Sequence, residues 1–437
     1  IEHPLVEASR RLDVVRLVRG EDLGPALAHE SGGLGQGCLD RFVRQLSSRA
    51  VRFEGLSLNV LAQRHSRHSR ILAVQVSLVR RSAHGFYRLR ESGMASVRRV
   101  VVLGYGLAGR FFHAPFIAAT PGLELAAVVT GDEERRAQVL ADYPGVAVLD
   151  TADEVWARAA DLDLVVVATP NRVHVPLALA ALETGIAVVV DKPLAPTAEE
   201  GRRLVEAARE RGLMLTVFQN RRWDGDFLTV KRLLADEALG KVHRFESRFE
   251  RWRPELAGTW RERAEEAGGL LFDLGSHLVD QALQLFGSVD SVYAEVDVRR
   301  PGAEVDDDVF LALEHASGVR SHLWMSALAG QLGPRFRVLG DRAAFVKHGL
   351  DVQEEALRAG RKPDEPGWGE EPRGSWGRLG VEGDLREVQT ERGNYRAFYE
   401  GVAASLGGGP PPVDPADAVT VLELLEEARA ASRSLST

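Results

Sequence analysis

Residues 97–109, VRRVVVLGYGLAG, decide the fold of this 437-residue chain. The first seven form an apolar run that predicts a short buried strand, and the last six, GYGLAG (104–109), match the pattern GxGxxG. A strand followed by this pattern and a helix is typical of a dinucleotide-binding turn. Gly104 would allow the tight turn, Gly106 would let a pyrophosphate approach the backbone, and Gly109 would let the helix pack on the strand. The alternative is an ordinary glycine turn.

The residues that follow repeat this alternation of apolar and amphipathic segments. Strands are expected at 123–129, 146–149, 162–168, 186–190 and 213–218, with helices between them that end near residues 119, 143, 185 and 211. Thr197 and Glu200 predict a capping box at the start of the last helix. Strands that are apolar on both faces and alternate with helices indicate a parallel sheet covered on both sides. We therefore expect a dinucleotide-binding α/β domain over residues 94–218.

Beyond Arg222 the pattern changes to strands with one polar face. Strands are expected at 241–254, 291–298, 308–315, 318–327, 335–340 and 343–348, and helices at 226–236, 270–286, 394–406 and 416–432. The segment 358–383 predicts a long loop, because it is rich in glycine, proline, tryptophan and charge. Alternating strands in series indicate a large open, mainly antiparallel sheet. We expect a second α/β domain over residues 219–437.

Residues 1–93 differ in charge from the rest of the chain. They hold 15 Arg, no Lys and 9 acidic residues, a net +6, so the remainder carries −8 − 6 = −14. They form either a basic extension that binds an acidic partner or sequence upstream of a start at Met94, the first methionine. We expect the second and assign residues 1–93 no function.

Composition excludes several classes of protein. The net charge of −8 argues against a general nucleic-acid surface. No apolar run has the roughly 18–20 residues that a membrane span needs, and the single Cys38 cannot form an intrachain disulfide. We expect a cytoplasmic protein without a membrane or nucleic-acid partner.

The segment ATPNRVH (168–174) follows an expected strand, where open α/β sheets bind their ligands. The candidate cofactor-binding residues in it are Thr169, Pro170, Asn171 and His174. His174 fits equally well a helix-start residue whose hydrogen bonds are satisfied.

The end of the second strand bears on the choice between NAD and NADP. An acidic residue there would bond the ribose 2′-hydroxyl of NAD. Thr130 and Gly131 stand at that end, and Arg135 and Arg136 lie on the next helix, which leaves room for the 2′-phosphate of NADP. Asp132 could still supply the acid. NADP is therefore expected, with NAD as the alternative.

Two further segments supply candidate catalytic residues. VVVDKPLAP (188–196) places Lys192, one of only 5 lysines beside 50 arginines, at a strand end. Lysine is a compact cation whose pKa shifts on burial, although a surface lysine is the alternative. GGLLFDLGSHLVD (268–280) places Asp273 and His277 on one face if the segment is helical. Histidine is the natural base near neutral pH and a carboxylate can orient it, whereas a structural histidine is the alternative.

Together the motifs GYGLAG, ATPNRVH, DKP and GGLLFDLGSH resemble those of the Gfo/Idh/MocA family, from about Arg98 to the end of the chain. The resemblance implies a Rossmann domain followed by an α/β domain whose open sheet often forms the oligomer interface, so a homodimer or homotetramer is expected. The family usually has EKP where this chain has DKP. Asp191 is one methylene shorter than glutamate, and we expect a retained site with shifted geometry.

The resemblance also implies roles for individual residues. Lys192 would position the reactive hydroxyl, His277 would be the general acid/base, and Asp273 would contact both substrate and histidine. Asn220 and Arg221 match positions that face the substrate. The cofactor-binding residues would be Gly104, Tyr105, Gly106, Leu107, Ala108, Gly109, Thr130, Gly131, Thr169, Pro170, Asn171, His174, Asp191 and Lys192.

A closer resemblance lies in FQNRRWDGDFLTVKRLL (218–234), RWRPELAGTWRE (251–262) and GLDVQEEALRAGRKP (349–363). These segments look like the branch that contains NADP-dependent scyllo-inositol 2-dehydrogenase. The hypothesis is an NAD(P)-dependent dehydrogenase that oxidises a secondary alcohol of a cyclic polyol or sugar without a metal. The alternatives are a reductase of another sugar or carbonyl compound and a non-catalytic regulator that senses the cofactor.

Overall fold

The computed structural model describes residues 56–63, 73–80, 97–259, 262–264 and 268–435, and the chain forms two compact units, residues 1–94 and 95–437. In the first unit, β1 (Leu56–Gln63) and β2 (Ala73–Arg80) pair antiparallel. The rest of the expected extension lies outside the described residues. Because residues 95–437 form one unit, the boundary at residue 218 stays a prediction.

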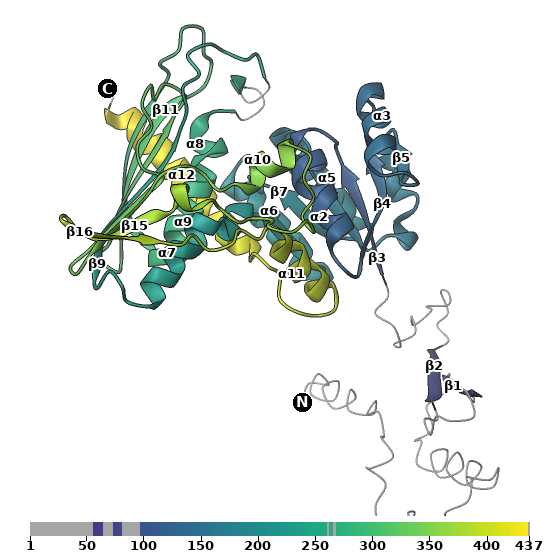
Figure 1. Ribbon diagram of the computed structural model, residues 1–437. Helices are drawn as coiled ribbons and strands as arrows, with labels where there is room; N and C mark the ends of the chain where they lie inside the picture. The colour runs from purple at the N-terminus through teal and green to yellow at the C-terminus, as the bar shows by residue number, and fades with distance from the viewer. Residues whose placement is uncertain (1–55, 64–72, 81–96, 260–261, 265–267, 436–437) are drawn as a thin grey trace, which may run out of the picture. The chain divides into compact units, whose positions relative to one another are not determined.

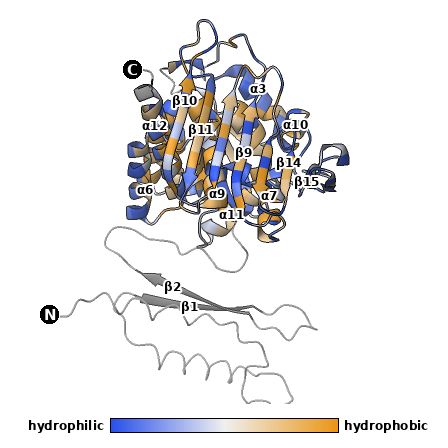
Figure 2. Ribbon diagram, turned by 90° about the vertical axis from the view of Figure 1, so that its left-hand side faces the viewer, coloured by the Kyte–Doolittle hydropathy of each residue, from blue (hydrophilic) through white to orange (hydrophobic). Residues whose placement is uncertain are grey.

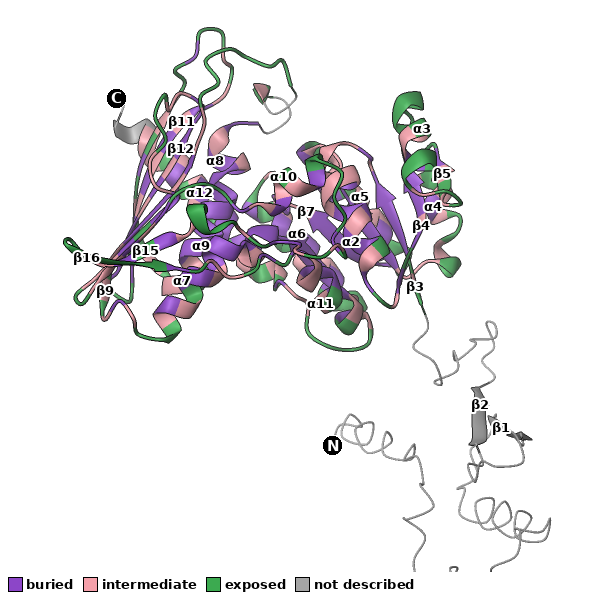
Figure 3. Ribbon diagram, in the orientation of Figure 1, coloured by how far each residue is buried: buried purple, intermediate pink, exposed green. Residues whose placement is uncertain are grey.

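The Rossmann part of the second unit is a six-stranded parallel sheet in the order β5-β4-β3-β6-β7-β8. Its strands are β3 (Arg98–Leu103), β4 (Leu123–Val129), β5 (Ala147–Leu149), β6 (Leu164–Val167), β7 (Ala187–Asp191) and β8 (Leu215–Phe218). The valines of β3, β6 and β7 are fully buried, because helices cover both faces of the sheet (Figure 3). The predicted parallel sheet is confirmed.

Local sequence signals explain where the connecting helices begin. A helical turn at Ala108–His113 continues into α2 (Ala114–Ala119), and the other helices are α3 (Glu133–Asp142), α4 (Asp153–Trp156), α5 (His174–Glu183) and α6 (Ala198–Arg211). The hydroxyl of Thr197 accepts the Glu200 backbone N–H at 3.2 Å, so the predicted cap is present.

The second sheet has eight strands in the order β10-β11-β12-β9-β13-β14-β15-β16, and every pair is antiparallel except β12–β9. Its strands are β9 (Val242–Glu250), β10 (Val289–Asp297), β11 (Asp308–His315), β12 (Arg320–Ser326), β13 (Phe336–Gly340), β14 (Ala344–Lys347), β15 (Gly377–Val381) and β16 (Asp384–Val388). The open, mainly antiparallel sheet is therefore confirmed.

The predicted loop at 358–383 is wrong in its last part, where β15 lies. Glycines at 377 and 380 hide the alternation expected of a strand. A Cβ at Gly377 would overlap the Phe345 ring of β14, and one at Gly380 would overlap the backbone of Asp384. Both glycines are thus required by neighbouring strands, which the sequence pattern does not show.

Helices cover one face of this sheet, between it and the Rossmann sheet (Figure 1). They are α7 (Gly225–Ala235), α8 (Leu270–Asp273), α9 (Gly275–Phe286) and α12 (Pro415–Leu435). Two more helices pack on the Rossmann part instead: α10 (Gln353–Arg358) on the helical turn at Ala108–His113, and α11 (Arg396–Leu406) on α2. The helix expected at 270–286 is broken at Leu274 into α8 and α9. The C-terminal α12 packs on α6 as well as on α9 and β10, so it joins the two sheets. None of the described helices is long and apolar enough to span a membrane.

Candidate active site at the strand ends

A cavity of about 520 Å³ opens at the carboxyl ends of β3, β4, β6 and β7. The predicted residues that line it are Gly104, Gly106, Leu107, Ala108, Thr130, Gly131, Thr169, Pro170, Asn171, Asp191, Lys192 and Asp273. Three other predicted cofactor residues, Tyr105, Gly109 and His174, are buried and are not among the lining residues. The Tyr105 hydroxyl donates to Asp142 at 2.9 Å. Residues from five separate predicted motifs therefore meet at one cavity.

The glycine turn has the geometry that a dinucleotide requires. Gly104 has φ of +96°, and an added Cβ there would lie 2.5 Å from the Ala168 carbonyl oxygen. A Cβ at Gly109 would overlap the carbonyl of Gly104, whereas one at Gly106 would meet no atom within 4 Å. Gly104 and Gly109 thus serve the fold, and Gly106 leaves open space at the cavity, as the predicted approach of a pyrophosphate to the backbone requires.

Asp132, the acidic residue just after β4, caps the next helix. The Asp132 carboxylate accepts the Arg135 backbone N–H at 2.9 Å and caps α3. Arg136 forms an ion pair with Asp150. Arg135 and Asp132 both line the cavity beside Thr130 and Gly131, and of the two it is the Asp132 carboxylate that is occupied by a helix cap.

Lys192 and Asp273 form the polar end of the cavity. The Lys192 ammonium donates to the Asp273 carboxylate at 2.6 Å and to its backbone carbonyl at 2.7 Å. The Lys192–Pro193 peptide bond is cis. The carboxylate that we expected beside His277 thus holds the lysine, across 81 positions of the sequence.

His277 lies on the first turn of α9 and is 5% exposed. Its Nδ1 is buried and has no hydrogen-bond partner among the described residues. Burial, and then the charges of Lys192, Arg221, Arg335 and Arg251, hold its pKa well below the usual value. The imidazole is therefore neutral at pH 7 and able to accept a proton.

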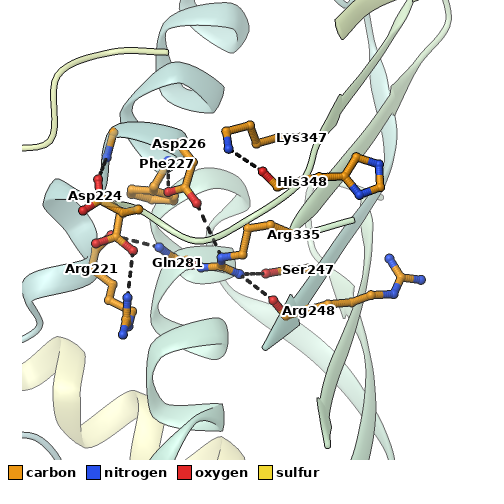
Figure 4. A network of polar contacts seen from close by, with 12 residues as sticks. Arg221, Asp224, Asp226, Phe227, Ser247, Arg248, Gln281, Arg335, Lys347 and His348 are labelled. Atoms are coloured by element: carbon orange, nitrogen blue, oxygen red, sulfur yellow. Dashed lines mark hydrogen bonds and ion pairs between the residues drawn. The ribbon is translucent and has the colours of Figure 1, made fainter. Parts of the chain in front are cut away.

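Asn220 and Arg221 are buried directly after β8, 5% and 6% exposed. The Arg221 guanidinium pairs with Asp224 at 3.3 Å and Glu354 at 3.0 Å (Figure 4). Arg221, whose charge acts on His277, is therefore held by two carboxylates.

Two family models match the chain: the oxidoreductase family with an NAD-binding Rossmann fold at residues 98–219, and the GFO/IDH/MocA C-terminal domain at residues 227–346. The chain belongs to the Gfo/Idh/MocA family. This member is an NAD(P)-dependent oxidoreductase that acts on a small molecule.

The similarity extends over almost the whole length of each of three related proteins. The uncharacterized oxidoreductase YdgJ of Escherichia coli is 43% identical over 333 residues, 75% of this chain and 94% of that protein. The scyllo-inositol 2-dehydrogenase (NADP(+)) IolW of Bacillus subtilis is 35% identical over 344 residues, 78% of this chain and 95% of that protein. The crystal structure of an oxidoreductase from Bacillus cereus is 28% identical with a TM-score of 0.69, and covers 76% of this chain and 96% of that one.

In this Gfo/Idh/MocA protein both ring nitrogens of His174 are occupied by backbone carbonyls, which fits the alternative given for this residue, a helix-start histidine whose hydrogen bonds are satisfied. Its ring nitrogens lie 2.8 Å from the Pro193 carbonyl and 2.9 Å from the Thr169 carbonyl. Burial lowers the pKa of His174. The side chain thus joins the segments after β6 and β7, which carry Thr169 and Lys192.

The motif analysis missed His113, which is fully buried behind Asp191. Its Nδ1 lies 2.6 Å from the Tyr399 hydroxyl, while its Nε2 lies 3.8 Å from the Asp191 carboxylate, beyond a hydrogen bond. Burial alone would raise the pKa of Asp191, but His113 and Lys192 lower it below its usual value. Only FFHAP (111–115) marks this histidine in the sequence, and its partner lies 78 positions away (191 − 113).

Proposed function

We propose that this oxidoreductase interconverts a secondary alcohol and the corresponding ketone on a cyclic polyol or sugar. The observation that carries the proposal is the buried imidazole of His277, whose Nδ1 has no hydrogen-bond partner among the described residues and whose pKa is lowered by burial and by the charge of Lys192, the lysine that lines the cavity with Asp273. The similarity to IolW, a scyllo-inositol 2-dehydrogenase, supports a polyol substrate and makes scyllo-inositol one candidate.

In the direction of oxidation, His277 accepts the proton of the substrate hydroxyl. The Lys192 ammonium stabilises the negative charge that develops on the same oxygen, and Asp273 holds the ammonium in place. When bound, the nicotinamide cofactor accepts the hydride from the carbon. Reduction of the ketone runs in reverse: His277 returns the proton, and the ketone oxygen becomes the hydroxyl.

A panel of polyols and sugars followed at 340 nm with both cofactors tests the proposal. Lys192→Met and His277→Asn should retain cofactor binding and lose about 10²–10⁴-fold in kcat, the range of general acid–base catalysis. Lys231→Met, on the exposed surface of α7, is the matched control. Full activity of either site variant would refute the roles, and cofactor binding without turnover of any substrate would favour a regulator.

We also propose NADP as the cofactor. Asp132 is engaged as a helix cap, and Arg135 lines the cavity where a 2′-phosphate would lie. Losing a charged hydrogen bond costs about 1.5–3 kcal/mol, so Arg135→Ala should raise the KM for NADP by about 10–100-fold. The KM for NAD should change little. Arg136→Ala, whose ion pair with Asp150 lies outside the cavity lining, is the control.

A homodimer or homotetramer is proposed through the outer face of the eight-stranded sheet, which no described element covers (Figure 2). Tyr293, Phe310, His322 and Trp324 form a row of ring contacts across β10, β11 and β12 on this face. Light scattering after gel filtration measures the oligomer, and Phe310→Glu should dissociate it. A monomeric wild type would refute this interface.

A further inference from the structure

Three arginines converge on one aromatic ring beside the proposed base. The guanidinium carbons of Arg221, Arg251 and Arg335 lie 4.7, 5.2 and 6.0 Å from the centre of the Phe249 ring. Arg251 directly follows β9 and Arg335 directly precedes β13, so the two sheet strands and the turn after β8 deliver the three cations to one place. The charges of all three reach His277.

Two of these arginines are neutralised by the protein. Arg221 pairs with Asp224 and Glu354. Arg335 lies 3.6 Å from the Asp226 carboxylate and donates to Ser247 and Gln281 at 2.6 and 2.7 Å (Figure 4). Their positions are therefore held by the fold.

Arg251 differs, because its guanidinium has no ion pair with any described residue. The nearest carboxylates that act on its charge are Asp273, which is bonded to Lys192, and Glu354, which is bonded to Arg221. Its Nε is buried without a hydrogen-bond partner in the described part of the chain, as are the Nε atoms of Arg221 and Arg335, so it is the missing ion pair that sets Arg251 apart. Burying donors without an acceptor is costly, so the site lacks a group that accepts from them.

We propose that the substrate carries a carboxylate or a phosphate in addition to the reacting alcohol, and that Arg251, assisted by Arg221, binds this group. The inference rests on the proposed function and specifies its substrate class as a sugar acid or a sugar or polyol phosphate. A guanidinium matches an oxyanion with two parallel hydrogen bonds. A neutral polyol would leave the charge of Arg251 beside other cations uncompensated. Arg251 is not among the residues that line the cavity, so the anion would bind next to the cavity on the side of Asp273, whose charge acts on Arg251.

The test compares neutral and charged members of matched sets: glucose, glucuronate and glucose 6-phosphate, and myo-inositol and its 1-phosphate. NADPH formation is followed at 340 nm with wild type, Arg251→Gln and Arg251→Lys. Arg253→Gln, two residues along and exposed, removes the same charge as a control. A charged member should exceed its neutral counterpart in kcat/KM by at least about tenfold, and Arg251→Gln should abolish this preference with a loss of about 10–100-fold. Arg251→Lys should retain part of it, and Arg253→Gln all of it.

A binding experiment separates failure of this inference from failure of the proposed function. The NADP-saturated protein is titrated with glucuronate or glucose 6-phosphate while its Tm is measured. A rise in Tm that Arg251→Gln abolishes supports the anion site even if no compound is turned over, which would overturn only the proposed reaction. Turnover of neutral polyols without any charge preference, or equal behaviour of Arg251→Gln and wild type, would overturn the inference and leave the proposed reaction intact. Preference for the phosphates over glucuronate, or the reverse, identifies the anion.

Discussion

Replacing Gly106 by alanine should weaken cofactor binding without destabilising the protein. The added Cβ would meet no protein atom within 4 Å, because it would project into the cavity. Gly106 is also absent from the residues with positive φ, so alanine can adopt its backbone conformation. Replacing Gly109, by contrast, would bring a Cβ to 3.0 Å from the Gly104 carbonyl carbon and closer still to its oxygen. The two substitutions therefore compare the same added methyl group at two positions of one turn, one facing open space and one facing the backbone of Gly104.

The two substitutions should change the free energy of unfolding in opposite directions. Gly106→Ala should leave the free energy of unfolding unchanged or raise it by about 0.4–1 kcal/mol, since alanine lowers the entropy of the unfolded chain. Gly109→Ala should lower it by about 1–3 kcal/mol, the usual cost of overpacking. If the pyrophosphate lies against Gly106, the methyl group should weaken cofactor binding at least about tenfold, or about 1.4 kcal/mol.

Urea unfolding measures stability, and the rise in Tm with NADP measures binding. At about 100 times the Kd, bound cofactor stabilises wild type by about 2.7 kcal/mol. A tenfold higher Kd leaves about 1.4 kcal/mol at the same cofactor concentration, so about half of this stabilisation or more should be missing in Gly106→Ala. Normal cofactor binding by Gly106→Ala would refute the reasoning, as would loss of stability in this variant equal to that in Gly109→Ala.

Three further predictions concern other parts of the molecule. Asp191→Glu should close the 3.8 Å gap between the carboxylate and His113 Nε2. The new hydrogen bond should raise the free energy of unfolding, measured in urea, by about 0.5–1.5 kcal/mol. The same gain in a His113→Asn background would contradict this contact. Burial lowers the pKa values of His174 and His277, so the unfolded chain binds more protons below about pH 6.5. Stability should therefore fall between pH 7.5 and 5.5, and urea unfolding of His277→Asn should show a smaller fall; an equal fall would exclude His277 as a source. A chain that begins at Met94 should bind NADP with unchanged Kd, because every cavity-lining residue lies within 103–273, and a weaker Kd would implicate residues 1–93.

Most of the fold could be predicted from local sequence patterns, because strands, helices and turns form according to residues that are close in sequence. The strand and glycine turn at 97–109, the parallel sheet, and the helix capped by Thr197 follow from hydrophobic periodicity, backbone freedom and capping. The same logic placed Lys192 and Asn171 at the cavity, since the carboxyl ends of parallel strands share one edge. The prediction of a loop at 358–383 is wrong at β15, because its glycines are required by close contacts with neighbouring strands that a sequence pattern does not show.

The sequence by itself thus determined the class of fold, the family motifs and the edge of the sheet that holds the cavity. The tertiary structure alone decided which charged groups meet there. Asp273 bonds Lys192, and Arg251 lies with Arg221 beside Phe249 without an ion pair to any residue that the structure describes. Such contacts join residues that are far apart in the chain, and a pair of charges brought together by folding leaves no periodic trace in the sequence.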